Sequence, residues 1–299
     1  MKPKHRPHSA GYLPYLVPGT LLCLVFLVVP LAMTFGYSFT EWNGIGSPEF
    51  TGVDNYSRLL EDSDFWASFR NIGFIVVGMA LLPTALGLLI SAVLFDYVGK
   101  KHGDGMVSVL RSGLYLPQVI PVAVTGLLWG WILAPEGALN GVLENLGLNS
   151  LARNWLGDPD LALWSVLAVL VWMQLGYPLV LFLSGLQRIN PELYEAADLD
   201  GASWWQRFRM ITIPLLRPEI YVVLVTTIIA GLKVFGQIYV LTGGGPGNHT
   251  LVPSYFAYQN FFERAEVGYG SAISSTMTLL VLVIAASFLT RQAREDGRA

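Results

Sequence analysis

The sequence predicts an all-α membrane protein with six transmembrane helices, and three observations lead to this prediction. The 299 residues are 53% hydrophobic and 13% charged, with a mean hydropathy of +0.52, which is more apolar than a soluble domain. Apolar runs reach the roughly 20 residues that a helix needs to cross a hydrocarbon core. The basic residues gather in alternate loops. The six runs lie near residues 13–37, 71–97, 110–133, 161–186, 219–241 and 268–290.

The distribution of basic residues predicts the orientation of these spans. Thirteen of the 18 lysines and arginines flank the outer ends of the first and last spans or lie in the intervals after the second and fourth spans. These are Lys2, Lys4, Arg6, Lys100, Lys101, Arg111, Arg188, Arg207, Arg209, Arg217, Arg291, Arg294 and Arg298. Because cytoplasmic loops collect positive charge, we expect both termini to be cytoplasmic. The net charge of −3, without a dense basic patch, argues against a nucleic-acid partner.

The chain reads as one integral domain with two short tails. We expect an N-terminal cytoplasmic tail at 1–12, a transmembrane domain at 13–290 and a C-terminal cytoplasmic tail at 291–299. The first apolar run is longer than the core of a signal peptide, so we expect an uncleaved helix. Cys23 is the only cysteine, which excludes an intrachain disulfide and a cysteine metal cluster.

A charged segment at 190–214 separates the fourth and fifth predicted spans and carries strong helix signals. Asn190 is placed as an N-cap ahead of a proline and a glutamate, and Gly201 can close a helix in the left-handed conformation. Ser203 and Gln206 have the spacing of a capping box. Two short helices joined at Gly201 are predicted. Helices this short are marginal in water, so the neighbouring spans or a soluble partner must hold them.

The residue order in this segment resembles that of the integral-membrane permease subunits of bacterial ABC importers that work with a substrate-binding protein. The family signature is Glu-Ala-Ala, three residues, Gly, nine residues, Ile, one residue, Leu and Pro. This chain matches it at Glu195, Ala196, Ala197, Gly201, Ile211 and Pro214, with Ile213 in place of the usual leucine. The likeness covers nearly the whole chain. The stretch LKVFGQIYVLTGGGPGNHT is similar to the fifth span and outer loop of the sugar-transporting branch.

The resemblance implies a type I ABC importer permease fold in a bacterial plasma (inner) membrane. In that family the signature forms a coupling helix that docks in a groove of an ATPase subunit. The implied coupling residues are Glu195, Ala196, Ala197, Asp200, Gly201, Ile211 and Pro214. The implied partners are a second homologous permease, two ATPase subunits and an extracytoplasmic sugar-binding protein. ATP and Mg would bind to the ATPase, and this chain would hold no cofactor.

Polar and aromatic residues inside the spans predict a substrate path, because polar groups are costly when they face lipid. The candidates are Trp172, Gln174, Tyr177, Lys233, Phe235, Gln237 and Tyr239. On the fifth span, Lys233 and Gln237 follow helical spacing and would share one face. Amides, hydroxyls and rings suit a neutral polyhydroxylated solute. Lys233 either lines the path or pairs between helices, or its stem snorkels toward the interface.

Two alternatives to a sugar importer, another solute and another transport mechanism, stay open on these residues, and a membrane enzyme is not supported. Glycerol 3-phosphate or another solute would give Lys233 an anionic ligand. An ion-coupled secondary transporter would need intramembrane carboxylates, and Asp96, at a span end, is nearly the only candidate. A membrane enzyme would need a catalytic set that four scattered histidines do not supply. We therefore expect no catalytic residue and no metal ligand. The glycines at 243–247 lack the Gly-Lys-Ser/Thr ending of a phosphate loop.

Overall fold

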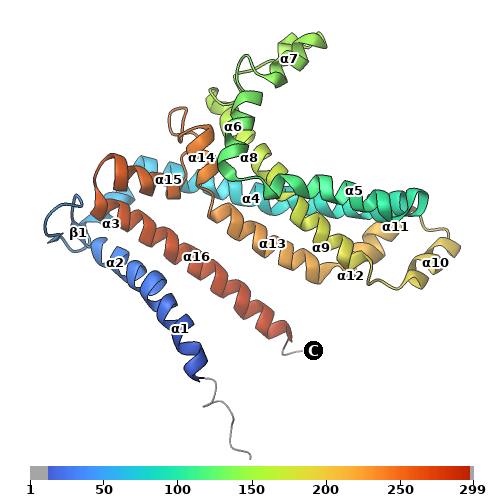
Figure 1. Cartoon of the computed structure of the whole chain (residues 1–299), viewed down its shortest axis with the longest axis horizontal. Coiled ribbons are helices and arrows are strands. Elements are labelled where there is room, and N and C mark those ends of the chain that lie inside the picture. The colour runs from blue at the N-terminus through green and yellow to red at the C-terminus, as the bar shows by residue number, and fades with distance from the viewer. Residues whose placement is uncertain (1–12, 297–299) are drawn as a thin grey trace, which may run out of the picture. The chain divides into compact units, whose positions relative to one another are not determined.

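The computed structural model describes residues 13–296 and is mainly helical (Figure 1). The chain divides into two compact units. Unit 1 contains the described residues up to Asp62 together with Ala257–Leu280, and unit 2 contains Ser63–Phe256 and the residues from Val281 onward. The predicted N-terminal tail at 1–12 lies outside the described residues. The last helix runs to Asp296 and so includes most of the predicted C-terminal tail at 291–299, whose cytoplasmic position stays a prediction.

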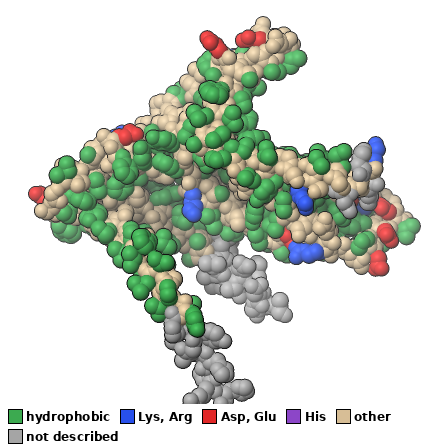
Figure 2. Space-filling view, viewed as in Figure 1, with side chains coloured by type: hydrophobic (Ala, Val, Ile, Leu, Met, Phe, Trp, Pro, Cys, Tyr) green, Lys and Arg blue, Asp and Glu red, His purple; other side chains and the backbone are tan. Residues whose placement is uncertain are grey.

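Unit 1 is built from an apolar N-terminal helix, a small hairpin and the first part of the last helix. Its elements are α1 (Leu13–Cys23), η2 (Leu24–Val28), α2 (Val29–Tyr37), β1 (Thr40–Glu41), β2 (Glu49–Phe50), α3 (Asp54–Glu61), η6 (Gln259–Glu263) and the start of α16 (Val267–Asp296). The strands pair antiparallel, with Thr40 opposite Phe50. Hydrophobic side chains are exposed along α1 and α2 (Figure 2), which suits a helix that lies in lipid.

Hydrogen bonds to backbone carbonyls join the loop after α2 to α3 and to the start of α16 within unit 1. The Asn55 side-chain amide donates to the carbonyls of Ser38 and Thr40 at 3.0 and 2.9 Å. The Gly268 amide donates to the Trp42 carbonyl at 3.1 Å. A Cβ atom at Gly268 would lie 1.9 Å from the Thr40 carbonyl oxygen, so only glycine allows this approach.

Unit 2 holds the remaining helices. They are α4 (Ser63–Val93), η3 (Leu94–Gly99), α5 (Lys100–Val119), α6 (Val122–Ile132), α7 (Ala138–Asn145), η4 (Asn149–Leu151), α8 (Pro159–Gln174), α9 (Gly176–Leu186), α10 (Pro191–Leu199), α11 (Trp204–Arg207), η5 (Phe208–Thr212), α12 (Ile213–Leu215), α13 (Arg217–Leu232) and α14 (Gly236–Leu241). Helix α15 (Pro253–Tyr258) ends at the boundary between the units. Within unit 2, α4 packs along α13 and α9, and α5 lies along α9 (Figure 1).

The apolar core of unit 2 joins its long helices to the 190–214 segment. One buried cluster takes residues from α4, α9, η5 and α13, and from the junction before α13. Its members are Leu88, Ala92, Phe182, Leu186, Phe208, Leu216 and Val223. Phe208 is the member from η5, and it is 6% exposed. The segment between the fourth and fifth predicted spans is therefore anchored in the core at one end.

By length and composition, three helices of the described chain are able to cross a membrane: Tyr15–Tyr37, Ser63–Gly99 and Val267–Ser287. Three further pairs pass the same test together but bend at a short break, which allows up to six spans. These pairs are Gly105–Val119 with Val122–Ile132, Pro159–Gln174 with Gly176–Leu186, and Trp204–Leu215 with Arg217–Leu232. The first, second and sixth predicted spans are thus continuous helices, whereas the other three are not.

The third predicted span, at 110–133, is not one continuous helix. The two halves meet at an angle of 99° at Ile120 and Pro121. Proline has no amide hydrogen and disfavours the helical conformation of the residue before it. Ile120 accordingly adopts an extended conformation, with φ −70° and ψ 131°. The fourth predicted span bends by 41° between α8 and α9. There Gly176 allows the backbone to approach Tyr115, whose Cα atom would be 2.6 Å from an added Cβ atom.

The fifth predicted span at 219–241 is also interrupted. Helix α13 ends at Leu232 with Lys233 as its C-cap, and α14 begins only at Gly236. Phe235, between them, has φ −141° and ψ −61°, which is not helical. The Ser254 hydroxyl donates to the Val234 carbonyl at 2.6 Å, so this backbone oxygen has a partner at the break. The predicted helical stripe through Lys233 and Gln237 therefore does not form.

Candidate functional site

The helix α10 begins and ends where the sequence predicts, because its capping contacts are local. The Asn190 side chain accepts a hydrogen bond from the Glu192 amide at 3.1 Å. At the other end, the Ala202 amide donates to the Ala197 carbonyl at 2.9 Å and the Gly201 amide donates to the Asp198 carbonyl at 3.0 Å. This pair of bonds is a Schellman motif, which needs a left-handed residue after the helix. Gly201 supplies it with φ +77°.

Helix α10 exposes an acidic and partly apolar surface. Its acidic residues are Glu192, Glu195, Asp198 and, at the C-cap, Asp200. Acidic side chains accordingly gather at this end of unit 2 (Figure 2). Glu195 and Ala196 are exposed, and Ala197 is half-buried. Leu199 is 90% exposed, which is unusual for a leucine on a helix that has an apolar core behind it. Helix α10 thus exposes both charged and apolar side chains.

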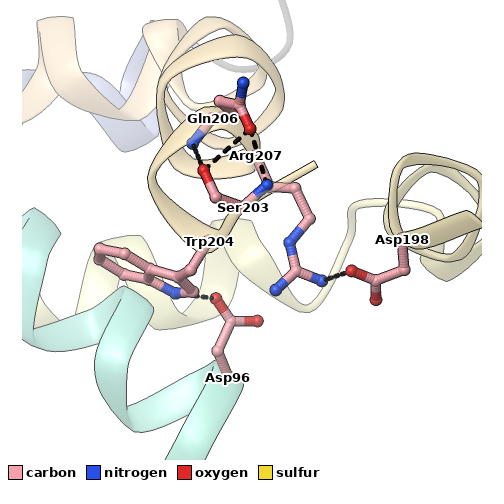
Figure 3. A network of polar contacts seen from close by, with 6 residues as sticks. All are labelled: Asp96, Asp198, Ser203, Trp204, Gln206 and Arg207. Atoms are coloured by element: carbon pink, nitrogen blue, oxygen red, sulfur yellow. Dashed lines mark hydrogen bonds and ion pairs between the residues drawn. The ribbon is translucent and has the colours of Figure 1, made fainter. Parts of the chain in front are cut away.

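The opposite face of α10 is fastened to the helical segment that follows it. Tyr194 is 8% exposed, and its hydroxyl lies 2.9 Å from the Thr212 hydroxyl. Burial raises the pKa of the Tyr194 phenol, so the group stays protonated at neutral pH. Asp198 forms an ion pair with Arg207, whose side chain is largely buried (Figure 3). These two contacts fix the distance between α10 and the segment 204–215.

The segment 204–215, which we call the arm, comprises α11, η5 and α12. Its start is a capping box: the Gln206 side chain accepts from the Ser203 amide at 2.7 Å, and the Ser203 hydroxyl caps the Gln206 amide (Figure 3). Ile211 and Pro214 are half-buried within the arm, so they position it and do not form the exposed surface. The arm ends at Leu215 and bends by 72° into α13.

A second ion pair lies just beyond this bend. Arg188, after the end of α9, pairs with Glu219 in the first turn of α13. The Glu219 side chain is 11% exposed and the Arg188 side chain 69%. Gly185 makes room for the glutamate, because an added Cβ atom would lie 3.2 Å from the Glu219 carboxyl carbon. The pair therefore links the two helices that flank the exposed segment.

The structure brings some of the predicted path residues together at the break in the fifth span. The rings of Phe235 and Tyr239 stack with centroids 5.7 Å apart, and Tyr255 lies 6.2 and 6.1 Å from them. The Gln237 side chain lies 3.8 Å from the sulfur of Met173 on α8. Lys233 is exposed at the end of α13. The three rings thus form an aromatic cluster on α14 and α15, beside the break in the fifth span.

The other path residues lie elsewhere. Trp172 packs against Trp129 with centroids 5.4 Å apart, in an edge-on arrangement. Gln174 is half-buried at the last position of α8. Tyr177 packs against the buried cluster that contains Phe208, beside the arm. In the described part of the chain, no group of three or more His, Cys, Asp and Glu side chains could hold a metal ion.

Sequence reasoning missed the residues that hold the exposed segment in place. Tyr194 contacts Thr212. Asp198 pairs with Arg207, and Asp96 accepts a hydrogen bond from Trp204 (Figure 3). The partners lie 9 to 108 positions apart in the chain, so no local pattern identifies them. The only signal was the position of Asp96 at the end of an apolar run, where a carboxylate needs a partner.

Several apolar helices with a capped, exposed acidic segment between them are typical of a polytopic membrane protein. Residues 106–294 match the family described as "Binding-protein-dependent transport system inner membrane component". The chain belongs to this family of ABC transporter permeases. The ion-coupled secondary transporter is therefore not supported.

Two relatives and one solved structure show how far the similarity extends. The chain is 37% identical over 284 residues to the trehalose/maltose transport system permease protein MalF of Thermococcus litoralis, covering 94% of this chain and 92% of the relative. It is 37% identical over 273 residues to the probable ABC transporter permease protein YurN of Bacillus subtilis, covering 90% and 91%. A crystal structure of a bacterial ABC transporter involved in the import of the acidic polysaccharide alginate has the same fold. Its TM-score is 0.80 at 24% identity, with 96% and 97% of the two chains covered.

Proposed function

We propose that this chain is the permease subunit of an ATP-driven importer for a sugar or oligosaccharide, and that α10 docks on a separate ATPase subunit. The observation that carries the docking proposal is the two-sided construction of α10. One face is exposed, with Glu195, Ala196 and Leu199, and the other face is held to the arm through Tyr194 and Asp198. A helix that is held to the arm on one face and exposed on the other can transmit the movement of a bound partner to the arm.

The proposed assembly contains this chain, a second homologous permease, two ATPase subunits and an extracytoplasmic binding protein. The ATPase subunits would bind ATP and Mg, and this chain would contribute no catalytic residue. The basic residues of the intervals around Lys100 and Arg207 support a cytoplasmic position for α10 and for both termini under the positive-inside rule. The complex would lie in a bacterial plasma membrane, with the binding protein on the opposite side from α10.

The proposal of a sugar rests on the named relatives and on the residues at the break between α13 and α14. Similar proteins include a probable starch degradation products transport system permease and a multiple sugar-binding transport system permease. Phe235, Tyr239 and Tyr255 offer ring surfaces, and Gln237 offers an amide. Rings and amides suit the apolar faces and hydroxyl groups of a sugar. We place the substrate path along these residues, with Trp172, Gln174 and Tyr177 as further candidates.

An anionic solute such as glycerol 3-phosphate is the second candidate, and the exposed ammonium of Lys233 favours it. The lysine lies two residues before Phe235 in the sequence. A negatively charged sugar would suit both the ammonium of Lys233 and the ring surfaces of Phe235 and Tyr239.

Charge reversal at Glu195 tests the docking surface. We expect Glu195→Lys to weaken retention of the ATPase subunits by up to about thirtyfold, because an exposed ion pair contributes about 0 to 1 kcal/mol and reversal replaces attraction with repulsion. Co-purification of the ATPase with the detergent-solubilised permease measures this. Glu263→Lys, an exposed reversal in η6, serves as the matched control and should retain the ATPase. Equal retention by both variants would refute the role of Glu195.

Uptake by cells that produce the complete importer tests the proposed substrate class. ATP-dependent uptake of radiolabelled maltose, trehalose or maltotriose should be present with the natural chain and lost in Glu195→Lys. Uptake of glycerol 3-phosphate alone would replace the sugar proposal with the second candidate. That outcome would leave the docking surface on α10 unaffected.

A further inference from the structure

The arm meets the end of α4 through one directional contact. The indole Nε1 of Trp204, at the start of the arm, donates to the Asp96 carboxylate at 2.8 Å (Figure 3). Asp96 lies in η3, directly after α4, and the two residues are 108 positions apart. Both side chains are half-buried. A carboxylate at the end of an apolar helix requires a hydrogen-bonding partner, and Trp204 provides one.

The remaining contacts of Trp204 are apolar and carry less directional information. Its ring stacks on Phe208 with centroids 5.2 Å apart and planes 11° apart, and the Tyr97 ring lies 6.2 Å away. Phe208 inserts into the cluster that contains Leu88 and Ala92 of α4. Stacked rings tolerate sliding, whereas a hydrogen bond from a single donor to a charged acceptor fixes direction and distance. The hydrogen bond from Trp204 to Asp96 therefore sets the position of the arm relative to the end of α4.

Both sides of the joint contain π-helical segments. Asp96 belongs to η3, and η5 begins four residues after Trp204. A π-helical turn interrupts the regular ladder of backbone hydrogen bonds and is frequent at functional sites. Such turns are also places where helices change direction. The Asp96–Trp204 contact thus joins two helices at the points where each has an irregular hydrogen-bond ladder.

We infer that Asp96 and Trp204 are positioning residues that transmit movement between the arm and α4. This inference rests on the proposed docking of α10. Movement of α10 reaches the arm through Tyr194 and Asp198, and it reaches α4 through the bond from Trp204 to Asp96. The same route operates in reverse, so a binding protein that moves the spans stimulates ATP hydrolysis through this contact.

The test compares variants that remove the hydrogen bond with one that keeps it. Trp204→Phe removes the only donor of the indole and retains a ring over Phe208. Asp96→Leu removes the acceptor, whereas Asp96→Asn retains a carbonyl oxygen in its place. The measurement is the stimulation of ATP hydrolysis by the binding protein in the complete importer, reconstituted in proteoliposomes. Basal hydrolysis and ATPase retention are recorded for the same samples.

We expect Trp204→Phe and Asp96→Leu to lower the stimulation roughly tenfold, the size of one hydrogen bond to a charged group. Basal hydrolysis and ATPase retention should be unchanged, and Asp96→Asn should recover most of the stimulation. The double variant Trp204→Phe/Asp96→Leu should be no worse than either single variant, because both remove the same bond. A defect in general folding would lower all three readouts together.

Two results would overturn the inference while leaving the proposed function standing. One is normal stimulation in Trp204→Phe and Asp96→Leu. The other is loss of ATPase retention in these variants, which would assign the contact to docking and not to transmission. If the natural chain retains no ATPase, the proposed function itself fails and the inference fails with it.

Discussion

Gly201→Val should abolish stimulated ATP hydrolysis in the assembled importer, whereas Gly201→Asn should preserve most of it. Gly201 has φ +77°, and an added Cβ atom would meet nothing within 4 Å. The requirement is therefore for the backbone conformation and not for space. A left-handed residue other than glycine costs about 1 to 2 kcal/mol, more when it is β-branched and less when it is asparagine.

Strain at position 201 should have a large effect on stimulated ATP hydrolysis because of where this residue lies. The Schellman bonds at Gly201 set the angle between α10 and the arm, so valine forces the chain to leave this conformation and moves the docking surface. Binding-protein-stimulated hydrolysis by the purified complex measures the effect. Equal activity of the valine and asparagine variants would show that the left-handed turn does not matter for coupling.

Arg188→Met should destabilise the permease by about 2 to 3 kcal/mol, because it leaves the buried Glu219 carboxylate without its partner. The exposure of Arg188 admits water, which keeps the cost below that of a fully buried pair. We expect the midpoint of thermal unfolding in detergent to fall by about 5 °C. Binding-protein-stimulated hydrolysis should fall as well, since the pair lies where the arm bends into α13.

The control for this prediction uses the same helix pair. Arg188→Met/Glu219→Met removes both charges and should recover most of the lost stability, since an apolar pair replaces a buried ion pair at little cost. Arg209→Met, at an exposed arginine of the arm, should leave the midpoint unchanged. A double variant less stable than Arg188→Met would contradict the account.

The sequence predicts those features of the candidate site that depend on neighbouring residues. The N-cap at Asn190, the turn at Gly201 and the capping box at Ser203 all form as expected, because each joins atoms a few residues apart. The first, second and sixth spans are continuous for the same reason, since an apolar run alone specifies them. A local signal for the 99° bend is also present, because Pro121 disfavours a helical conformation of Ile120, but the prediction of a span at 110–133 did not include the bend.

Other features depend on contacts between distant parts of the chain. The break in the fifth span at Phe235 has no proline, and the hydroxyl that satisfies the Val234 carbonyl comes from Ser254 in α15. The partner of Asp96 is 108 positions away. Sequence periodicity therefore places Lys233 within a helix, whereas α13 ends at Leu232 in the structure.

The most direct test of the central claim is cross-linking from the exposed side of α10. Cys23 is the only cysteine, so Cys23→Ala gives a background without thiols in which Leu199→Cys adds one at a position that is 90% exposed. A thiol-to-amine cross-linker should join this position to an ATPase subunit, whereas Leu282→Cys on α16 should give no such product. The account is contradicted if Leu199→Cys captures no ATPase, or if a membrane-impermeant maleimide labels it only from outside the cell.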